Sequence, residues 1–297
     1  MKKKVVVVSH DAGGSEIIAA YVKKHAHEKD FHVYTAGPGA RVFRREHIAF
    51  KRAPLEREKL ANILGNHHDA EFALLGTGWM TQIESIALSE AKNIGLKTVV
   101  YLESWSGYRE RFGYPKKGWQ KNLPEEIWVG DKYALALAQK NFPKVCIRHI
   151  ANEYFKNIRQ RYNEEKKEGS LASKILFLSN AATGEEEIFQ SLCEYVLQKN
   201  ISRILRIRFH PADNLSRYDL VIQKFKGVVR VEKSHEKYIT RDFLQARVVI
   251  GTETVAMVGA VMAGIRTISV IIPGKKSQLP FKKIIRVKKI DGKFDLI

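Results

Sequence analysis

A histidine and an aspartate follow the first apolar run of the chain, in the sequence SHDAGGS. Imidazole and carboxylate groups are common general bases near neutral pH, so His10 and Asp11 are candidate catalytic residues. Gly13 and Gly14 leave room for a ligand close to the backbone. The alternative is that Asp11 or Ser15 caps a helix. The glycine spacing is not that of the dinucleotide fingerprint, which argues against a nicotinamide cofactor.

A second histidine ends another strand-like run, at residues 203–209, in the sequence RFHP. Pro211 restricts the backbone after His210. An imidazole held in this way can donate a hydrogen bond to a phosphate oxygen, and Arg208 would add positive charge. We therefore predict that His210 and Arg208 bind phosphate. A surface histidine in a turn is the alternative.

Two hydroxyl-rich turns precede helix-like segments in the second half of the chain. They contain Gly251, Thr252, Glu253 and Thr254 in one case, and Ser179, Asn180 and Thr183 in the other. Helix N-termini present unpaired N–H groups and a partial positive charge, which suit phosphate groups. We predict that both turns bind the phosphates of a nucleotide. Ordinary helix capping by the threonines is the alternative.

The segment from Glu103 to Phe112 combines a carboxylate, aromatic rings and two arginines. Glu103 is a third candidate catalytic residue. Trp105 offers a plane on which a sugar ring or a base can stack, while Arg109 and Arg111 can bind an anion. We predict that this loop contacts a substrate, and a purely structural loop is the alternative.

The histidines and cysteines do not have the spacing of a metal site. His67 and His68 are adjacent, so their side chains would point apart, and we expect a solvated turn there. Cys146 and Cys193 are distant in sequence and lie in apolar-periodic segments, so we expect both to be buried as small hydrophobic residues. No metal ion and no cofactor are predicted.

The candidate residues follow strand-like runs in a regular alternation of strand and helix. The expected strands cover residues 4–9, 32–36, 72–75, 97–102 and 127–129, and then 174–178, 203–209, 228–231, 247–250 and 267–272. Alternation of this kind predicts right-handed βαβ units and parallel sheets, which bind ligands at the carboxyl ends of the strands. We expect an α/β protein with two Rossmann-like parallel-sheet domains that face each other across a cleft.

A charged stretch without apolar periodicity interrupts this alternation at residues 163–173. Such composition is typical of a linker between domains. We therefore predict an N-terminal Rossmann-like domain at residues 1–162, which carries the acceptor and catalytic side, and a C-terminal nucleotide-binding domain at residues 174–297.

The chain of 297 residues has a formal net charge of +19. No apolar run approaches the roughly 20 residues that a membrane helix needs. The first apolar run is too short for a signal peptide, and we expect a cytoplasmic protein. The charge favours an anionic partner: a phosphorylated substrate, or an anionic membrane at its inner face. Basic residues are spread along the chain without a recognition motif, so no specific nucleic-acid partner is expected.

The second half resembles the nucleotide-binding domain of GT-B-type glycosyltransferases and related sugar-nucleotide enzymes, over roughly residues 174–274. The motifs are Ser179-Asn180, the sequence RFHP at 208–211, and residues 248–254 followed by an apolar helix. The His-Pro pair is similar to that of bacterial sialyltransferases and of capsule and teichoic-acid polymerases, which implies that His210 contacts the donor phosphate. Gly259 stands where many such enzymes carry a glutamate that holds the donor ribose, with Glu253 as a partial substitute.

The resemblance implies a metal-independent glycosyltransferase-like enzyme of surface-polysaccharide synthesis, with a nucleotide-activated sugar as donor and a glycan or lipid-linked acceptor. Asp11 or His10 would deprotonate the acceptor hydroxyl. The acceptor side would consist of Gly13, Gly14, Trp105, Arg109 and Arg111. The same architecture also suits a sugar-nucleotide epimerase or hydrolase. The missing ribose glutamate favours a third alternative, a non-catalytic subunit that binds a nucleotide sugar.

Overall fold

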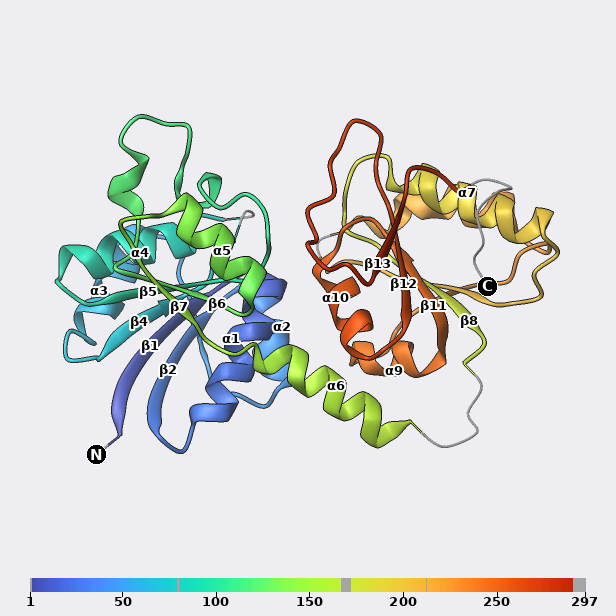
Figure 1. Cartoon of the computed structure of the whole chain (residues 1–297). Coiled ribbons are helices and arrows are strands. Elements are labelled where there is room, and N and C mark those ends of the chain that lie inside the picture. The colour runs from blue at the N-terminus through green and yellow to red at the C-terminus, as the bar shows by residue number, and fades with distance from the viewer. Residues whose placement is uncertain (1, 79–80, 167–171, 212, 291–297) are drawn as a thin grey trace. The chain divides into compact units, whose positions relative to one another are not determined.

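The chain forms two compact units, Met1–Tyr154 and Phe155–Ile297, each built around one β-sheet (Figure 1). The structure is a computed structural model that describes residues 2–78, 81–166, 172–211 and 213–290. All the paired strands are parallel, which confirms the predicted α/β class with two Rossmann-like domains. The predicted cleft between them stays a prediction. Within the described residues, no helix is long and apolar enough to cross a membrane.

The first sheet has the strand order β3-β2-β1-β4-β5-β6-β7. Its strands are β1 (Lys3–Ser9), β2 (Lys29–Thr35), β3 (Lys51–Arg52), β4 (Phe72–Leu75), β5 (Thr98–Leu102), β6 (Glu126–Val129) and β7 (Cys146–His149). The valines of β1 are completely buried. Helices cover both faces of a parallel sheet, and a central strand is therefore apolar along its whole length, as the sequence predicts here.

The helices of the first unit connect these strands. They are α1 (Ala12–His25), α2 (Gly37–Arg45), α3 (Arg57–Gly65), α4 (Ile83–Asn93) and α5 (Lys132–Asn141), with the short 3₁₀ helices η1 (Glu110–Phe112) and η2 (Trp119–Asn122). Helix α1 buries Ile17 and Ile18 in one core with the valines of β1, and Phe43 of α2 joins the same core. This packing fixes the N-termini of α1 and α2 at the carboxyl ends of the strands.

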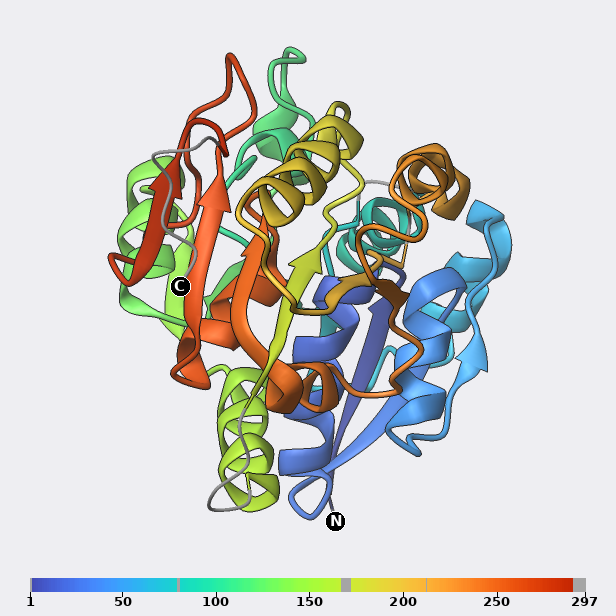
Figure 2. The same ribbon diagram turned by 90° about the vertical axis from the view of Figure 1, so that its right-hand side faces the viewer.

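The second sheet has the strand order β10-β9-β8-β11-β12-β13, and Figure 2 shows β13 at one edge. Its strands are β8 (Lys174–Leu178), β9 (Leu205–Arg208), β10 (Val231–Lys233), β11 (Ala246–Gly251), β12 (Arg266–Val270) and β13 (Ile284–Val287). Its helices are α6 (Glu153–Glu165), α7 (Glu185–Gln198), η3 (Leu215–Tyr218), α8 (Asp219–Lys224), α9 (Ile239–Gln245) and α10 (Val255–Met262). Apolar side chains of α7 and α8 pack on one face of the sheet.

Several short strands were not predicted, namely β3, β7 and β13. They lie at the edges of the sheets and lack the continuous apolar run of a strand that is buried on both faces. The strand expected at 228–231 begins at Val231. Cys146 is exposed at the start of β7, so its expected burial is wrong, whereas Cys193 is buried as predicted.

Helix α6 lies at the boundary between the two units. Its side chains at Phe155 and Ile158 are buried, and Ile158 contacts the backbone position of Gly259 in α10. Residues 155–162, which the sequence analysis assigned to the first domain, thus group with the second unit. Within the linker predicted at 163–173, residues 167–171 lie outside the described residues.

Candidate functional site

The predicted site residues lie at the carboxyl ends of parallel strands in each unit. We call the ends of β1, β4 and β5, with the residues that follow them, the first edge. The corresponding ends of β8, β9 and β11 form the second edge. Ligands bind at such edges because loops and helix N-termini converge there.

Glu103 and Arg111 form a buried ion pair at the first edge. The Arg111 Nη1–Glu103 Oε1 distance is 2.6 Å, and only 5% and 8% of the two side chains are exposed. Thr77, after β4, donates its hydroxyl to Glu103 Oε2 at 2.9 Å, and Arg111 also donates to the Thr77 carbonyl. The predicted acceptor ligand Arg111 therefore neutralises the predicted catalytic residue Glu103, and both are held rigidly.

His10 is nearly buried where β1 leads into α1, with 8% of the residue exposed. Its Nδ1 atom lies 4.0 Å from Asp11 Oδ1 and has no hydrogen-bond partner among the described residues. The ring packs over Gly37, where an added Cβ would lie 2.5 Å from His10 Nε2. The Asp11 side chain makes no capping hydrogen bond to α1, so the capping alternative is wrong for this residue.

Glu84 lies at the start of α4 and reaches the end of β1. Its Oε1 atom accepts the backbone N–H of His10 at 2.7 Å, and the residue is only 4% exposed. The Oε2 atom has no hydrogen-bond partner within the described part of the chain. Burial, with a smaller contribution from the charge of Asp11, raises the pKa of Glu84 to about 7. This carboxyl can therefore hold or release a proton near neutral pH.

The other residues predicted to bind an acceptor have different surroundings. Trp105 is buried and donates its indole N–H to Asp131 Oδ2 at 2.8 Å, so its ring is part of the first unit's interior. Arg109 is partly exposed. A Cβ on Gly13 would touch Glu103 at 3.6 Å, and one on Gly14 would lie 3.9 Å from the Gly76 backbone. The start of α1 thus packs directly on the first edge.

The second edge is organised around the buried carboxylate of Glu185, in the first turn of α7. It accepts the backbone N–H of Asn180 at 2.9 Å, the Thr252 hydroxyl, and the Tyr218 hydroxyl at 3.1 Å. Asn180 Nδ2 in turn donates to the Thr252 carbonyl at 3.0 Å. Burial raises the pKa of Glu185. The structure thus brings the predicted residues Asn180 and Thr252 together, although they are far apart in sequence.

His210 follows β9 at the same edge and is partly exposed. Its backbone N–H donates to Ser179 Oγ at 2.8 Å, and that hydroxyl donates to Asp213 Oδ2 at 2.6 Å. Arg217 and Tyr218 also bond to Asp213, whose side chain is 1% exposed. The backbone at His210 is therefore fixed beside Ser179, as the sequence predicts for two residues that follow adjacent strands.

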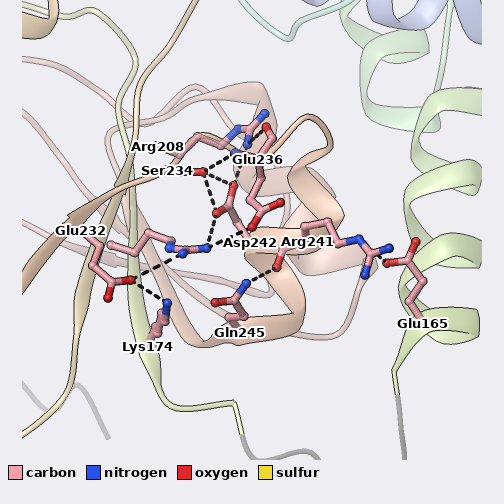
Figure 3. Close-up of polar contacts among 10 residues, drawn as sticks. Glu165, Lys174, Arg208, Glu232, Ser234, Glu236, Arg241, Asp242 and Gln245 are labelled. Carbon is pink, nitrogen blue, oxygen red and sulfur yellow. Dashed lines mark hydrogen bonds and ion pairs between the residues drawn. The ribbon is translucent and has the colours of Figure 1, made fainter. Parts of the chain in front are cut away.

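Arg208 points to a different set of partners. Figure 3 shows Arg208 and Ser234 directed at the carboxylate of Asp242 in α9. The Arg208 Nη1–Asp242 Oδ2 distance is 2.6 Å, and Arg206 Nη1 lies 3.1 Å from Asp242 Oδ1. Asp242 is completely buried. The two arginines thus balance a buried charge and join β9 to α9.

Glu253 holds a loop in place. It adopts a positive φ of 60°, and its carboxylate accepts hydrogen bonds from the hydroxyls of Ser269 and Ser277 and from the backbone N–H groups of Gln278 and Leu279. These donors use both carboxylate oxygens. The expected partial substitute for a ribose ligand therefore anchors residues 277–279.

The remaining predicted phosphate ligands lie where α7 and α10 begin. Thr254 precedes α10 and makes no capping hydrogen bond, and Thr183 is exposed before α7. A Cβ on Gly251 would lie 2.7 Å from the Leu178 carbonyl, so this position tolerates only glycine. A Cβ on Gly259 would meet Ile158 at 3.1 Å. Position 259 therefore faces the interior of the second unit and has no room for a glutamate.

Three of the polar residues at the two edges were not predicted from the sequence: Thr77, Glu84 and Glu185. Thr77 follows an apolar run and could have been found as a strand-end residue. Both glutamates stand in the first turn of a helix, where acidic residues are common because of the helix dipole, so the sequence does not distinguish them from surface residues. Among the described residues, no group of three His, Cys, Asp or Glu side chains could hold a metal ion.

No protein-family model matches this sequence. A comparison with curated proteins also finds no match. The fold of this chain, however, is similar to that of several solved structures. UDP-GlcNAc 2-epimerase from Neisseria meningitidis, bound to UDP-GlcNAc, has a TM-score of 0.67 at 13% identity, over 93% of this chain and 84% of that one.

Two further structures show the same fold. UDP-N-acetylglucosamine 2-epimerase from Rickettsia bellii has a TM-score of 0.63 at 9% identity, over 94% of this chain and 85% of that one. A glycosyltransferase from Rickettsia africae has a TM-score of 0.57 at 10% identity, over 92% and 80%. These likenesses confirm the fold expected from the resemblance to GT-B-type enzymes.

Proposed function

We propose that this protein is an enzyme that epimerises a UDP-activated sugar. The observation that carries the proposal is the cluster of ionisable side chains at the first edge, where Glu84 binds the backbone of His10 and Asp11 lies beside the imidazole. The likeness to an epimerase with bound UDP-GlcNAc supports the choice of substrate class. A fold alone does not fix an activity, so the side chains at the edges carry the argument.

In this proposal the second edge binds the nucleotide. The N-termini of α7 and α10 offer backbone N–H groups to the diphosphate, and the partly exposed His210 adds a donor beside them. The phosphate contacts would come from Ser179, Asn180, Thr183, Gly251, Thr252 and Thr254. Stabilising the diphosphate in this way favours charge that develops on it when the bond to the sugar weakens.

The first edge would move a proton on the sugar. A base can remove the proton from the carbon beside the anomeric centre while its electron pair expels the diphosphate as a double bond forms, and an acid returns a proton on the other face as the diphosphate adds back. His10 and Asp11 are the side chains that would do this. Transfer to an acceptor is less well supported, because Trp105 is buried against Asp131 and Arg111 is paired with Glu103. Neither side chain is then available to hold a glycan.

The test is incubation of the purified full chain with UDP-GlcNAc and related UDP-sugars in deuterium oxide, without acceptor, followed by NMR. We expect an epimeric sugar nucleotide and deuterium at the inverted carbon, because the removed proton exchanges with solvent.

The other outcomes would each contradict epimerisation. Release of UDP without deuterium in the recovered substrate would indicate a hydrolase. Turnover only after a glycan or lipid-linked acceptor is added would indicate a glycosyltransferase. A rise in melting temperature with UDP-sugars, but no turnover either without or with an added acceptor, would indicate a binding subunit.

A further inference from the structure

A concentrated basic surface lies on the second unit, at β13 and in the loop that leads to it. We call it the basic face, and its exposed members are Lys275, Lys276, Lys282, Lys283, Arg286, Lys288 and Lys289. The sequence from residue 254 to residue 290 contains no aspartate or glutamate. The positive charge of this segment is therefore uncompensated within the segment itself.

Several lysines elsewhere in the chain are paired with carboxylates. In the first unit, Lys4 lies 2.7 Å from Asp69, and Lys29 lies 2.6 Å from Glu71. In the second unit, Lys174 lies 2.7 Å from Glu232. No carboxylate of the described residues pairs with the exposed lysines at 275, 276, 282, 283 and 288. These five lysines fall within residues 275–288, and this local density distinguishes the basic face from the rest of the surface.

The loop that carries the first lysines is held in a defined shape. Glu253 accepts the backbone N–H groups of Gln278 and Leu279. Arg286 Nε donates to Ser277 Oγ at 2.7 Å, and its guanidinium also bonds to the Leu279 carbonyl. Both carboxylate oxygens of Glu253, which anchors this loop, already accept hydrogen bonds. The lysines on both sides of this anchored segment are therefore presented together.

An apolar side chain accompanies the positive charge. Ile285 points outward from β13 and is 44% exposed, and β13 is an edge strand. Lysines that flank an edge strand, as Lys283 and Lys288 flank β13, also discourage strand pairing with other chains, but Lys275 and Lys276 lie farther from the strand. Lysines around an exposed aliphatic residue suit the headgroup region of a membrane. Nucleic acid is a poorer match, because the aromatic residue of this segment, Phe281, is partly buried and offers little surface for base stacking.

We propose that the basic face binds the surface of a membrane that contains acidic phospholipids, with Ile285 at the headgroup level. Each lysine near an anionic bilayer adds a comparable increment to binding, so several together produce a measurable affinity without a spanning segment. This proposal is independent of the reaction that the two edges catalyse.

The experiment is sedimentation of the full chain with vesicles of phosphatidylcholine, with and without phosphatidylglycerol. The test variant combines Lys275→Gln, Lys276→Gln, Lys282→Gln and Lys283→Gln. The control variant makes the same change in charge at four other exposed lysines, with Lys140→Gln, Lys144→Gln, Lys199→Gln and Lys226→Gln. Unchanged melting temperatures would show that both variants are folded.

We expect binding only to vesicles with phosphatidylglycerol, a loss of at least about tenfold in the test variant, and a much smaller loss in the control. Ile285→Ser should weaken vesicle binding further without changing the net charge. Equal losses in the two lysine variants, or no binding that depends on acidic lipid, would overturn the proposal. It would also be overturned if a DNA duplex, and not the vesicles, depended on the four test lysines.

Discussion

The two edges satisfy their buried polar groups in different ways. At the second edge, both carboxylate oxygens of Glu185, and both of Glu253, accept hydrogen bonds. At the first edge, Glu84 Oε2 and His10 Nδ1 are buried without a hydrogen-bond partner among the described residues. The first edge also holds a saturated pair, Glu103 with Arg111, directly beside these groups.

The difference indicates a division of labour between the edges. Buried polar groups without a hydrogen-bond partner lower stability, and proteins retain them mainly at functional sites. Titratable groups in such surroundings are candidates for proton transfer. The saturated carboxylates of the second edge instead fix loops and helix starts, which suits a site that binds phosphates through its backbone. Changes at the first edge should therefore affect turnover, and changes at the second edge should affect stability.

The largest expected effect is on turnover. If the proposed function holds, Asp11→Asn and His10→Gln should each lower kcat on a UDP-sugar about a thousandfold, because loss of a general acid or base removes that much catalysis. Steady-state kinetics would measure it. His27→Gln changes a histidine that is 71% exposed in the same unit and is the matched control. An activity within about threefold of the unmodified enzyme in both first-edge variants would refute the division of labour.

A smaller effect is expected on the stability of the second unit. Glu185→Ala leaves the Asn180 N–H and the Thr252 hydroxyl without their buried acceptor and removes one of the two acceptors of the Tyr218 hydroxyl, which should cost about 4 kcal/mol. Glu84→Ala removes the acceptor of the His10 N–H and should cost about 2 kcal/mol. Equal costs for the two substitutions would remove the contrast between the edges.

The chain carries a separate probe for each unit. Its tryptophans all belong to the first unit, at Trp79, Trp105, Trp119 and Trp128. Tryptophan fluorescence during denaturant unfolding therefore reports on the first unit alone. Cys193 is completely buried in the second unit, so thiol labelling in a Cys146→Ser background reports on the opening of that unit. Glu185→Ala should change the labelling of Cys193 and leave the fluorescence transition in place.

The pH dependence of stability tests the environment of Glu84. Its pKa is about 7 in the folded chain, against 4.5 for an ordinary glutamate. Between these values the folded state keeps a proton that the unfolded state releases, so this group's contribution to the free energy of unfolding falls as pH rises, by about 3 kcal/mol in total. Above about pH 7 the loss is complete. Below both pKa values the contribution is fully present.

Glu84→Gln should abolish this pH dependence. The free energy of unfolding of the variant and of the unmodified chain is measured by tryptophan fluorescence between about pH 5 and about pH 8. Glu71→Gln is a control of opposite sign. The hydrogen bond from Lys29 lowers the pKa of Glu71, so its contribution is lost as pH falls. Parallel stability curves for the unmodified chain and Glu84→Gln would show that Glu84 is an ordinary surface-like acid.

The sequence predicts much of the frame of both edges. An apolar run buried on both faces ends abruptly in polar residues, so Ser9-His10 and Ser179-Asn180 could be placed at strand ends. The sequence does not predict contacts that depend on tertiary structure. Glu84 belongs to the helix after β4 but accepts a hydrogen bond from the backbone after β1, and no local sequence pattern predicts that contact. Trp105 and Arg111 look like ligand-binding residues because their buried partners, Asp131 and Glu103, are not evident from spacing.

The smallest expected effect concerns the packing of His10 against α2. Gly37 has a φ of +54°, and a Cβ there would lie 2.5 Å from His10 Nε2. Gly95 also has a positive φ, of +70°, but a Cβ there would meet no atom within 4 Å. Both alanine substitutions carry the strain of a left-handed backbone, so the difference between them isolates the contact with the imidazole. Gly37→Ala should cost about 1 kcal/mol more than Gly95→Ala in the fluorescence transition, and only Gly37→Ala should lower kcat. Equal effects on both quantities would mean that the position of the His10 ring does not matter, and the first edge would then have to work through Asp11 alone.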